Sequence, residues 1–192
     1  MSDGGHRGTR AVQRMVEFAP STGGLALWVR HHDLPADDDA HTPPVATDGD
    51  TLFYAKGFEQ RPLPEQVGLV AHEVLHIALR HAQRYVDLQR LLGDVDLKLF
   101  NTCADAIVSS TLDHLSWLQL PKAAVRLDKL LESVLGVFES VEKSLLEWDV
   151  EQLYRTIDDR RLPPQSGRRN AQGEDRAMSN ADAAGSGSSR VA

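Results

Sequence analysis

The sequence has a single cysteine, Cys103, so no disulfide can form within the chain. This fits either a reducing compartment or a secreted protein that does without bridges. No run approaches the roughly 18 apolar residues that a transmembrane helix needs. The opening residues 1–10 also lack the apolar stretch that is typical of a signal peptide. We therefore expect a soluble, cytoplasmic protein with no membrane partner.

Excess positive charge is absent as well. The chain has 21 lysines and arginines against 28 aspartates and glutamates, which gives a net charge of −7. Binding to a phosphate backbone needs a basic surface, so we expect no nucleic-acid partner. A hydrophobic content of 41% over 192 residues is ordinary for a globular protein and suffices for one domain with a sizeable core.

Large apolar residues are scarce at both ends of the chain. Residues 1–9 are mostly glycine and polar residues, and residues 163–192 consist mainly of glycine, serine, alanine, asparagine and charged residues. Such compositions cannot bury enough apolar surface to fold. We predict a disordered N-terminus over 1–9, one folded domain over 10–162, and a disordered polar tail or linker over 163–192.

The first part of the predicted domain combines a helix with two strands. Hydrophobic spacing predicts a helix over 10–19, which Pro20 ends, and apolar and β-branched residues predict strands over 25–30 and 51–55. The acidic run 37–39 is either a cation site or a solvated loop, and the loop is favoured because no ligand spacing follows. The second strand could hold an extended peptide by edge pairing or could be purely structural.

Helical spacing then continues to the end of the predicted domain. It predicts helices over 67–84, 94–112 and 129–142, and Asp149 with Gln152 marks the start of a further helix through a capping box. A few strands among many helices predict an α+β fold that is mostly helical, with a small sheet before the helix at 67–84.

The helix predicted at 67–84 contains the sequence HEVLH at residues 72–76, an HExxH motif. Residues four apart lie on one face of a helix, so His72 and His76 can present two imidazoles to one metal ion. Glu73 is rotated by roughly 100° from His72, which lets it reach a water on that ion. Zinc hydrolases need this geometry. The alternative is two helix-face histidines that are satisfied by hydrogen bonds.

A catalytic zinc ion usually takes three protein ligands, so the motif needs a further one. On an unbroken helix His81 lies on the face opposite His72, which favours a role at the helix end or as a partner of a ligand. Asp105 lies close to the apolar stripe of the next helix, so it should be paired or metal-bound if it is buried. It is either the third ligand, a partner of His72 or His76, or a structural aspartate.

An ordered set of motifs runs along the chain: Val45-Ala46-Thr47-Asp48-Gly49, Leu52-Phe53-Tyr54, the HExxH motif with His81 and Arg84, Asn101, Asp105, and Leu120-Pro121. This set resembles the bacterial metallopeptidase domain that often precedes a von Willebrand A-like domain. The resemblance covers residues 10–160. No von Willebrand A-like half is present in this sequence.

The resemblance implies a zincin-like fold with one Zn²⁺ ion, a peptide or protein substrate, and an association with an AAA+ ATPase of the MoxR type. His72, Glu73, His76 and Asp105 match the family pattern directly. Ser109 departs from it, because asparagine is expected there.

The resulting hypothesis is a zinc metallopeptidase in which Glu73 is the general base that deprotonates the attacking water. Tyr54 and His114 are candidates for the donor that stabilises the oxyanion, although a structural role is favoured for each. One alternative is a non-catalytic zinc-containing adaptor module that works with the ATPase. Another is a domain that binds no metal.

Overall fold

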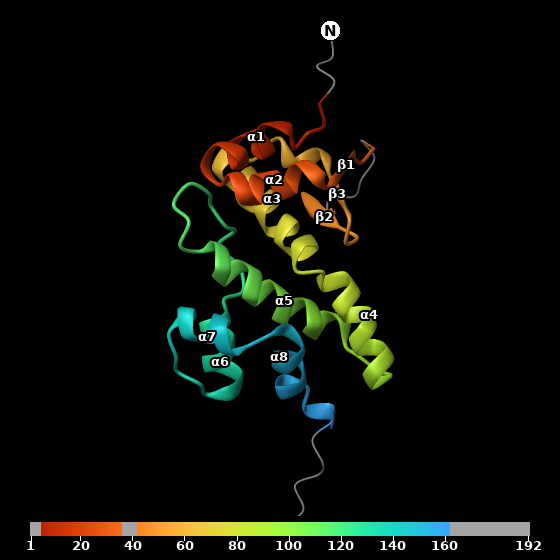
Figure 1. Cartoon of the computed structure of the whole chain (residues 1–192), viewed down its shortest axis with the longest axis vertical. Coiled ribbons are helices and arrows are strands. Elements are labelled where there is room, and N and C mark those ends of the chain that lie inside the picture. Colours follow the sequence, from red (N-terminus) through yellow and green to blue (C-terminus); the bar gives the residue numbers. More distant parts are fainter. Residues whose placement is uncertain (1–4, 36–41, 162–192) are drawn as a thin grey trace, which may run out of the picture. The chain divides into compact units, whose positions relative to one another are not determined.

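The computed structural model describes residues 5–35 and 42–161. It contains two compact units, Met1–Ile157 and Asp158–Ala192. The acidic run 37–39 and the predicted tail over 163–192 lie outside the described residues. The elements of the described residues, labelled in Figure 1 where there is room, are α1 (Thr9–Phe18), α2 (Pro20–Trp28), β1 (Arg30–Asp33), β2 (Val45–Thr47), β3 (Thr51–Tyr54), the 3₁₀ helix η1 (Lys56–Phe58), α3 (Leu63–Ala78), α4 (His81–Leu92), α5 (Leu97–Leu112), α6 (Leu127–Leu135), α7 (Val141–Glu147), α8 (Val150–Ile157) and the 3₁₀ helix η2 (Asp159–Arg161).

These elements form the α+β fold that the sequence predicts: many helices and one small sheet that precedes α3. Among the described residues, no helix is both long and apolar enough to cross a membrane.

The sheet has the strand order β1-β3-β2. Strand β1 pairs with β3 in parallel, and β2 pairs with β3 in antiparallel orientation, with Val45 opposite Tyr54. The predicted strand at 51–55 is therefore the central strand of the sheet. The expectation that it could pair with a peptide is wrong, because neighbours occupy both of its edges. In this sheet, β2 is an edge strand, and it packs against α3.

The strand predicted over 25–30 is also wrong, because most of this segment lies in helix α2. Pro20 begins the helix, where its missing N–H group leaves no hydrogen bond unmade. Gly23 lies against α1 so closely that a Cβ atom on it would come within 2.5 Å of the Val16 backbone nitrogen. Gly23, one of two glycines that resemble a turn in sequence, thus allows close packing of two helices, and strand β1 begins only at Arg30.

The helix predicted over 129–142 is in fact two helices. Helix α6 ends at Gly136, which takes the left-handed conformation, and Ser140 begins α7 by accepting a hydrogen bond from the Lys143 backbone nitrogen. The predicted start of α8 is confirmed, because the Asp149 carboxylate accepts a hydrogen bond of 2.7 Å from the Gln152 backbone nitrogen.

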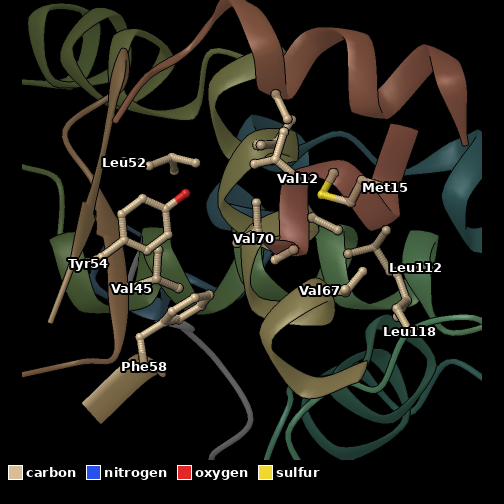
Figure 2. Packing of buried hydrophobic residues seen from close by; sticks show 14 of the residues in the cluster. Val12, Met15, Val45, Leu52, Tyr54, Phe58, Val67, Val70, Leu112 and Leu118 are labelled. Atoms are coloured by element: carbon tan, nitrogen blue, oxygen red, sulfur yellow. The ribbon is translucent and has the colours of Figure 1, made fainter. Parts of the chain in front are cut away.

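Buried apolar residues form two clusters, which we call the first core and the second core. The first core joins α1, α2, the sheet and α3. Figure 2 shows its side chains from α1, the sheet and α3. The second core is built from helices α4 to α8. Helix α5 belongs to both, because Val108 and Leu112 lie in the first core while Phe100 and Cys103 lie in the second.

The first turns of α3 are fixed by the segment that follows α5. The Gln119 backbone nitrogen donates a hydrogen bond of 2.9 Å to the Pro64 carbonyl. Gly68 allows this approach, since a Cβ atom there would lie 2.2 Å from the Gln119 carbonyl oxygen. The helix that carries the HExxH motif is therefore positioned by direct backbone packing.

Candidate metal centre

Helix α3 ends before His81, so the prediction of one unbroken helix over 67–84 is wrong. The Leu79 and Arg80 backbone nitrogens make the last hydrogen bonds, to the Leu75 and Ile77 carbonyls. Arg80 has φ 56° and ψ 38°, the left-handed conformation that glycine commonly takes after a helix, and α4 then starts at His81. The chain changes direction here, and the argument that placed His81 on the opposite face no longer holds.

The structure brings His72, His76 and Asp105 together. The Nε2 atoms of the two histidines lie 3.0 Å apart, and Oδ1 of Asp105 lies 3.3 Å from Nε2 of His72 and 3.2 Å from Nε2 of His76. Each residue offers one ligand atom to the same point, so the three could hold a metal ion. We call this group the His72–His76–Asp105 cluster.

Asp105 reaches the cluster because α5 packs against α3. Asp96 fixes the start of α5, where its side chain accepts a hydrogen bond from the Leu99 backbone nitrogen. The side chain of Asp105 is 42% exposed, whereas those of His72 and His76 are 18% and 14% exposed. The cluster is therefore open to solvent on the side of the carboxylate.

Electrostatics distinguishes the two carboxyl groups at the cluster. Burial raises the pKa of Asp105, but hydrogen bonds and charge from the two imidazoles outweigh it and hold the pKa well below its usual range. Burial also raises the pKa of Glu73, and there the nearby imidazoles offset the effect only in part. Asp105 is thus an anion at neutral pH, while Glu73 has a higher affinity for a proton.

His81 contacts the cluster through His76. The two Nδ1 atoms lie 3.0 Å apart, and the His81 side chain is buried. Burial, helped by the charges of His76 and Arg84, lowers the pKa of His81 to about 3, so its imidazole is neutral at pH 7. One of the two Nδ1 atoms must then carry the shared hydrogen. If His76 donates it, the Nε2 atom of His76 keeps its lone pair for the cluster.

The contact with His76 corresponds to one of the two roles predicted for His81, that of a partner of a ligand. Arg84, one turn further along α4, donates a hydrogen bond of 2.7 Å from Nε to the Glu151 carboxylate of α8. This ion pair joins α4 to α8.

Of the remaining predicted residues, only Glu73 adjoins the cluster. It is partly buried, and its side chain makes no hydrogen bond or ion pair with any other described residue. Tyr54 is fully buried in the first core, with its hydroxyl 2.8 Å from Nδ1 of His31. His114 is exposed beyond the end of α5, and Ser109 is buried with no partner for its hydroxyl among the described residues.

Sequence reasoning missed β2, although a signal for it was present. The β-branched residues Val45 and Thr47 flank a small residue and lead directly into the turn at Asp48-Gly49, where the Gly49 nitrogen donates to the Thr47 hydroxyl. A three-residue strand is too short to be recognised by alternation alone, so its pairing with β3 is evident only in the structure.

Two imidazoles one helical turn apart, a carboxylate from a neighbouring helix and an adjacent glutamate are the residue types of a hydrolytic metal centre. The chain belongs to the family described as "Putative metallopeptidase domain", whose model matches residues 4–191. The resemblance to a metallopeptidase domain, stated from the sequence motifs, is thereby confirmed. Membership implies a metal ion and a peptide or protein substrate. No curated protein and no solved structure matches the chain.

Proposed function

We propose that this chain is a zincin-like, zinc-dependent metallopeptidase in which His72, His76 and Asp105 hold the ion and Glu73 is the general base. The observation that carries the proposal is the convergence of three ligand atoms from two helices, at separations of 3.0 to 3.3 Å, beside a glutamate without a partner among the described residues.

The cluster fits zinc by geometry and by donor type. Tetrahedral zinc with bonds of about 2.0–2.1 Å to nitrogen and oxygen holds its ligand atoms about 3.3 Å apart. The separations of 3.0, 3.2 and 3.3 Å agree with this value. Two imidazoles and one carboxylate leave one position open, as catalytic zinc requires. The open side of Asp105 favours this site over the closed, four-ligand site of a non-catalytic adaptor.

Zinc, when bound, supplies a Lewis acid that acidifies a coordinated water and polarises a carbonyl. The residues of the chain do the remaining work. Glu73 takes the proton of the attacking water and transfers it to the leaving amine, and its raised pKa suits both steps. Asp105 stays ionised, as a ligand must, and His81 holds His76 in the tautomer that presents Nε2.

The substrate backbone needs a place beside α3. Strand β2 packs against α3 and has an edge that does not pair with β3, so an extended peptide could add to the sheet there. This role replaces the one that the sequence assigned to the strand at 51–55.

The variant Glu73→Gln tests the mechanism. It removes the base and keeps the shape of the side chain, so hydrolysis of a peptide mixture should fall by about 10²–10⁴-fold. Zinc content, measured by elemental analysis of protein purified without chelator, should stay the same as in the wild type. A Glu73→Gln protein that cleaves peptides at the wild-type rate would contradict the assignment of the base, and wild-type protein without metal would contradict the proposal as a whole.

A further inference from the structure

A pocket of about 410 Å³ opens beside the His72–His76–Asp105 cluster. Its apolar lining comes from Tyr85 and Val86 of α4 and from Leu97 and Phe100 of α5, and His76 forms part of its wall. Ligand pockets in proteins are commonly of this size and are lined mainly by apolar and aromatic side chains. We call this cavity the α4–α5 pocket.

We propose that the α4–α5 pocket binds an apolar side chain, aliphatic or aromatic, of a substrate residue that flanks the scissile peptide bond. The inference rests on the proposed function and extends it, because it names the class of substrate. His76 connects the pocket to the cluster, because its Nε2 atom belongs to the cluster and its ring lines the pocket. A side chain in the pocket therefore holds its own backbone next to the cluster.

The floor and one wall of the pocket are fixed apolar surfaces. Phe100 is buried and packs edge-on against Tyr85, with ring centroids 5.4 Å apart. The Tyr85 hydroxyl donates to the Val95 carbonyl at 3.4 Å, so its polar atom is engaged within the protein. What the pocket offers from these two residues is ring carbon, which gains from contact with an apolar group.

The rim excludes acidic side chains. The turn Thr47–Gly49 packs directly on α4, because Gly49 has φ +111° and a Cβ atom on it would lie 2.9 Å from Cβ of Ala82. Within this turn, Oδ1 of Asp48 accepts hydrogen bonds from the Asp50 and Thr51 backbone nitrogens, which holds its carboxylate at the rim. A substrate aspartate or glutamate in the pocket would therefore meet the negative charge of Asp48.

Cleavage of a mixed peptide library by zinc-loaded protein, with the sites identified by mass spectrometry, measures this preference. We expect leucine, isoleucine, methionine and phenylalanine to be enriched at one position next to the cleaved bond. For matched peptides, kcat/KM should be at least about tenfold higher with leucine than with glycine there. Aspartate and glutamate should be depleted. Cleavage without an apolar preference at either flanking position would overturn the proposal and leave the peptidase function intact.

Val86 and Leu91 provide a matched pair of variants. Both lie on α4 and are exposed, Val86 at 36% and Leu91 at 69%, but only Val86 lines the pocket. Val86→Asp should abolish the preference for leucine and reduce cleavage of the leucine peptide by about tenfold. Leu91→Asp should leave both unchanged. Val86→Trp, which fills the pocket without adding charge, should have the same effect as Val86→Asp, and circular dichroism checks that each variant folds.

A binding measurement separates the pocket from the chemistry. In nuclear magnetic resonance titrations of the metal-free wild type, N-acetyl-L-leucinamide should shift the backbone signals of Val86, Leu97 and Phe100, whereas N-acetyl-L-aspartic acid amide should not. Val86→Asp should remove the shifts and Leu91→Asp should keep them. If the wild type binds the leucine probe but cleaves no peptide, the proposed function fails and the pocket stands. If the probe does not bind, the pocket proposal fails whatever the outcome of the cleavage experiment.

Discussion

The first and second cores differ in construction and in what each contributes to the candidate metal centre. The first core combines a sheet with helices, and its helix α3 supplies His72, Glu73 and His76. The second core is entirely helical, and its helix α4 supplies His81 and part of the lining of the α4–α5 pocket. Asp105 comes from α5, which packs in both cores. The HExxH motif therefore belongs to one core, whereas the complete candidate centre needs both.

The largest expected effect comes from removing the side chain of Asp105, whose helix α5 packs in both cores. Asp105→Ala deletes one of the three proposed ligands, so zinc affinity should fall by at least about 100-fold, more than the loss of a residue that only supports a ligand costs. Isothermal titration calorimetry would measure it. Asp87→Ala, which removes an exposed carboxylate of α4 that does not belong to the cluster, should leave affinity unchanged. Equal affinity in Asp105→Ala and the wild type would show that α3 and its own core suffice for the metal.

The next effect concerns packing inside the first core. At Gly23 a Cβ atom would meet the α1 backbone at 2.5 Å, whereas at Gly24 it would meet nothing within 4 Å. Gly23→Ala should reduce the free energy of unfolding by an amount near the upper end of about 1–3 kcal/mol. Gly24→Ala should raise it by up to about 1 kcal/mol, because alanine favours a helix. Urea denaturation compares them, and equal effects would contradict the contact between α1 and α2.

The pH dependence of stability in the metal-free protein tests the environment of His81 on α4. The pKa of His81 is about 3 in the folded protein, below the value of about 6.5 in an unfolded chain. As pH falls below about 6.5, the unfolded state binds a proton that the folded state does not, and stability is lost until the pH reaches the folded pKa. At pH 5 the loss should be about 2 kcal/mol relative to pH 7 or above.

His81→Phe removes this group and keeps an aromatic ring in its place. The difference in unfolding free energy between pH 5 and pH 7, measured with urea, should therefore be smaller in this variant by about 2 kcal/mol. Comparing this difference between the variant and the wild type cancels the contributions of other titrating groups. One of these is His6, whose pKa is also lowered by burial. An unchanged pH dependence would mean that His81 is not held neutral against His76.

The smallest expected effect lies at the junction of α3 and α4. Arg80 adopts a left-handed conformation that costs a non-glycine residue about 1 kcal/mol. Arg80→Gly should relieve this cost, partly offset by the greater freedom of glycine in the unfolded chain, for a net gain of up to about 1 kcal/mol. Thermal unfolding would measure the change. A marked loss of stability would show that the Arg80 side chain, and not its backbone angle, holds the turn.

The sequence predicts the local features of the site well. Helical spacing places His72 and His76 on one face, and the same spacing places Asp105 on a second helix. That the carboxylate lies within 3.3 Å of both imidazoles depends on how α5 packs against α3, which no local pattern encodes. The place of Asp105 beside the apolar stripe of its helix singled out this aspartate, and the family resemblance supported the choice.

The incorrect predictions have identifiable physical causes. Leu-Ala-Leu-Trp after two glycines has the composition of a strand, and only the fit of Gly23 against Val16 favours the helix. The end of α3 was missed because an arginine occupies a position where glycine is the usual signal. The order of the strands was beyond prediction, since β2 has only three residues.

The shortness of β2 has a consequence for the behaviour of the protein in concentrated solution. An uncovered strand edge can template self-association, and natural proteins limit this risk by keeping edge strands short. Strand β2 spans Val45–Thr47 and ends in a glycine turn, so another copy of the chain finds little backbone to pair with. The same shortness limits how firmly any peptide backbone can be held there. Selectivity for a substrate would then depend on contacts with its side chains. A strand edge that is too short to promote aggregation can therefore still belong to a selective site.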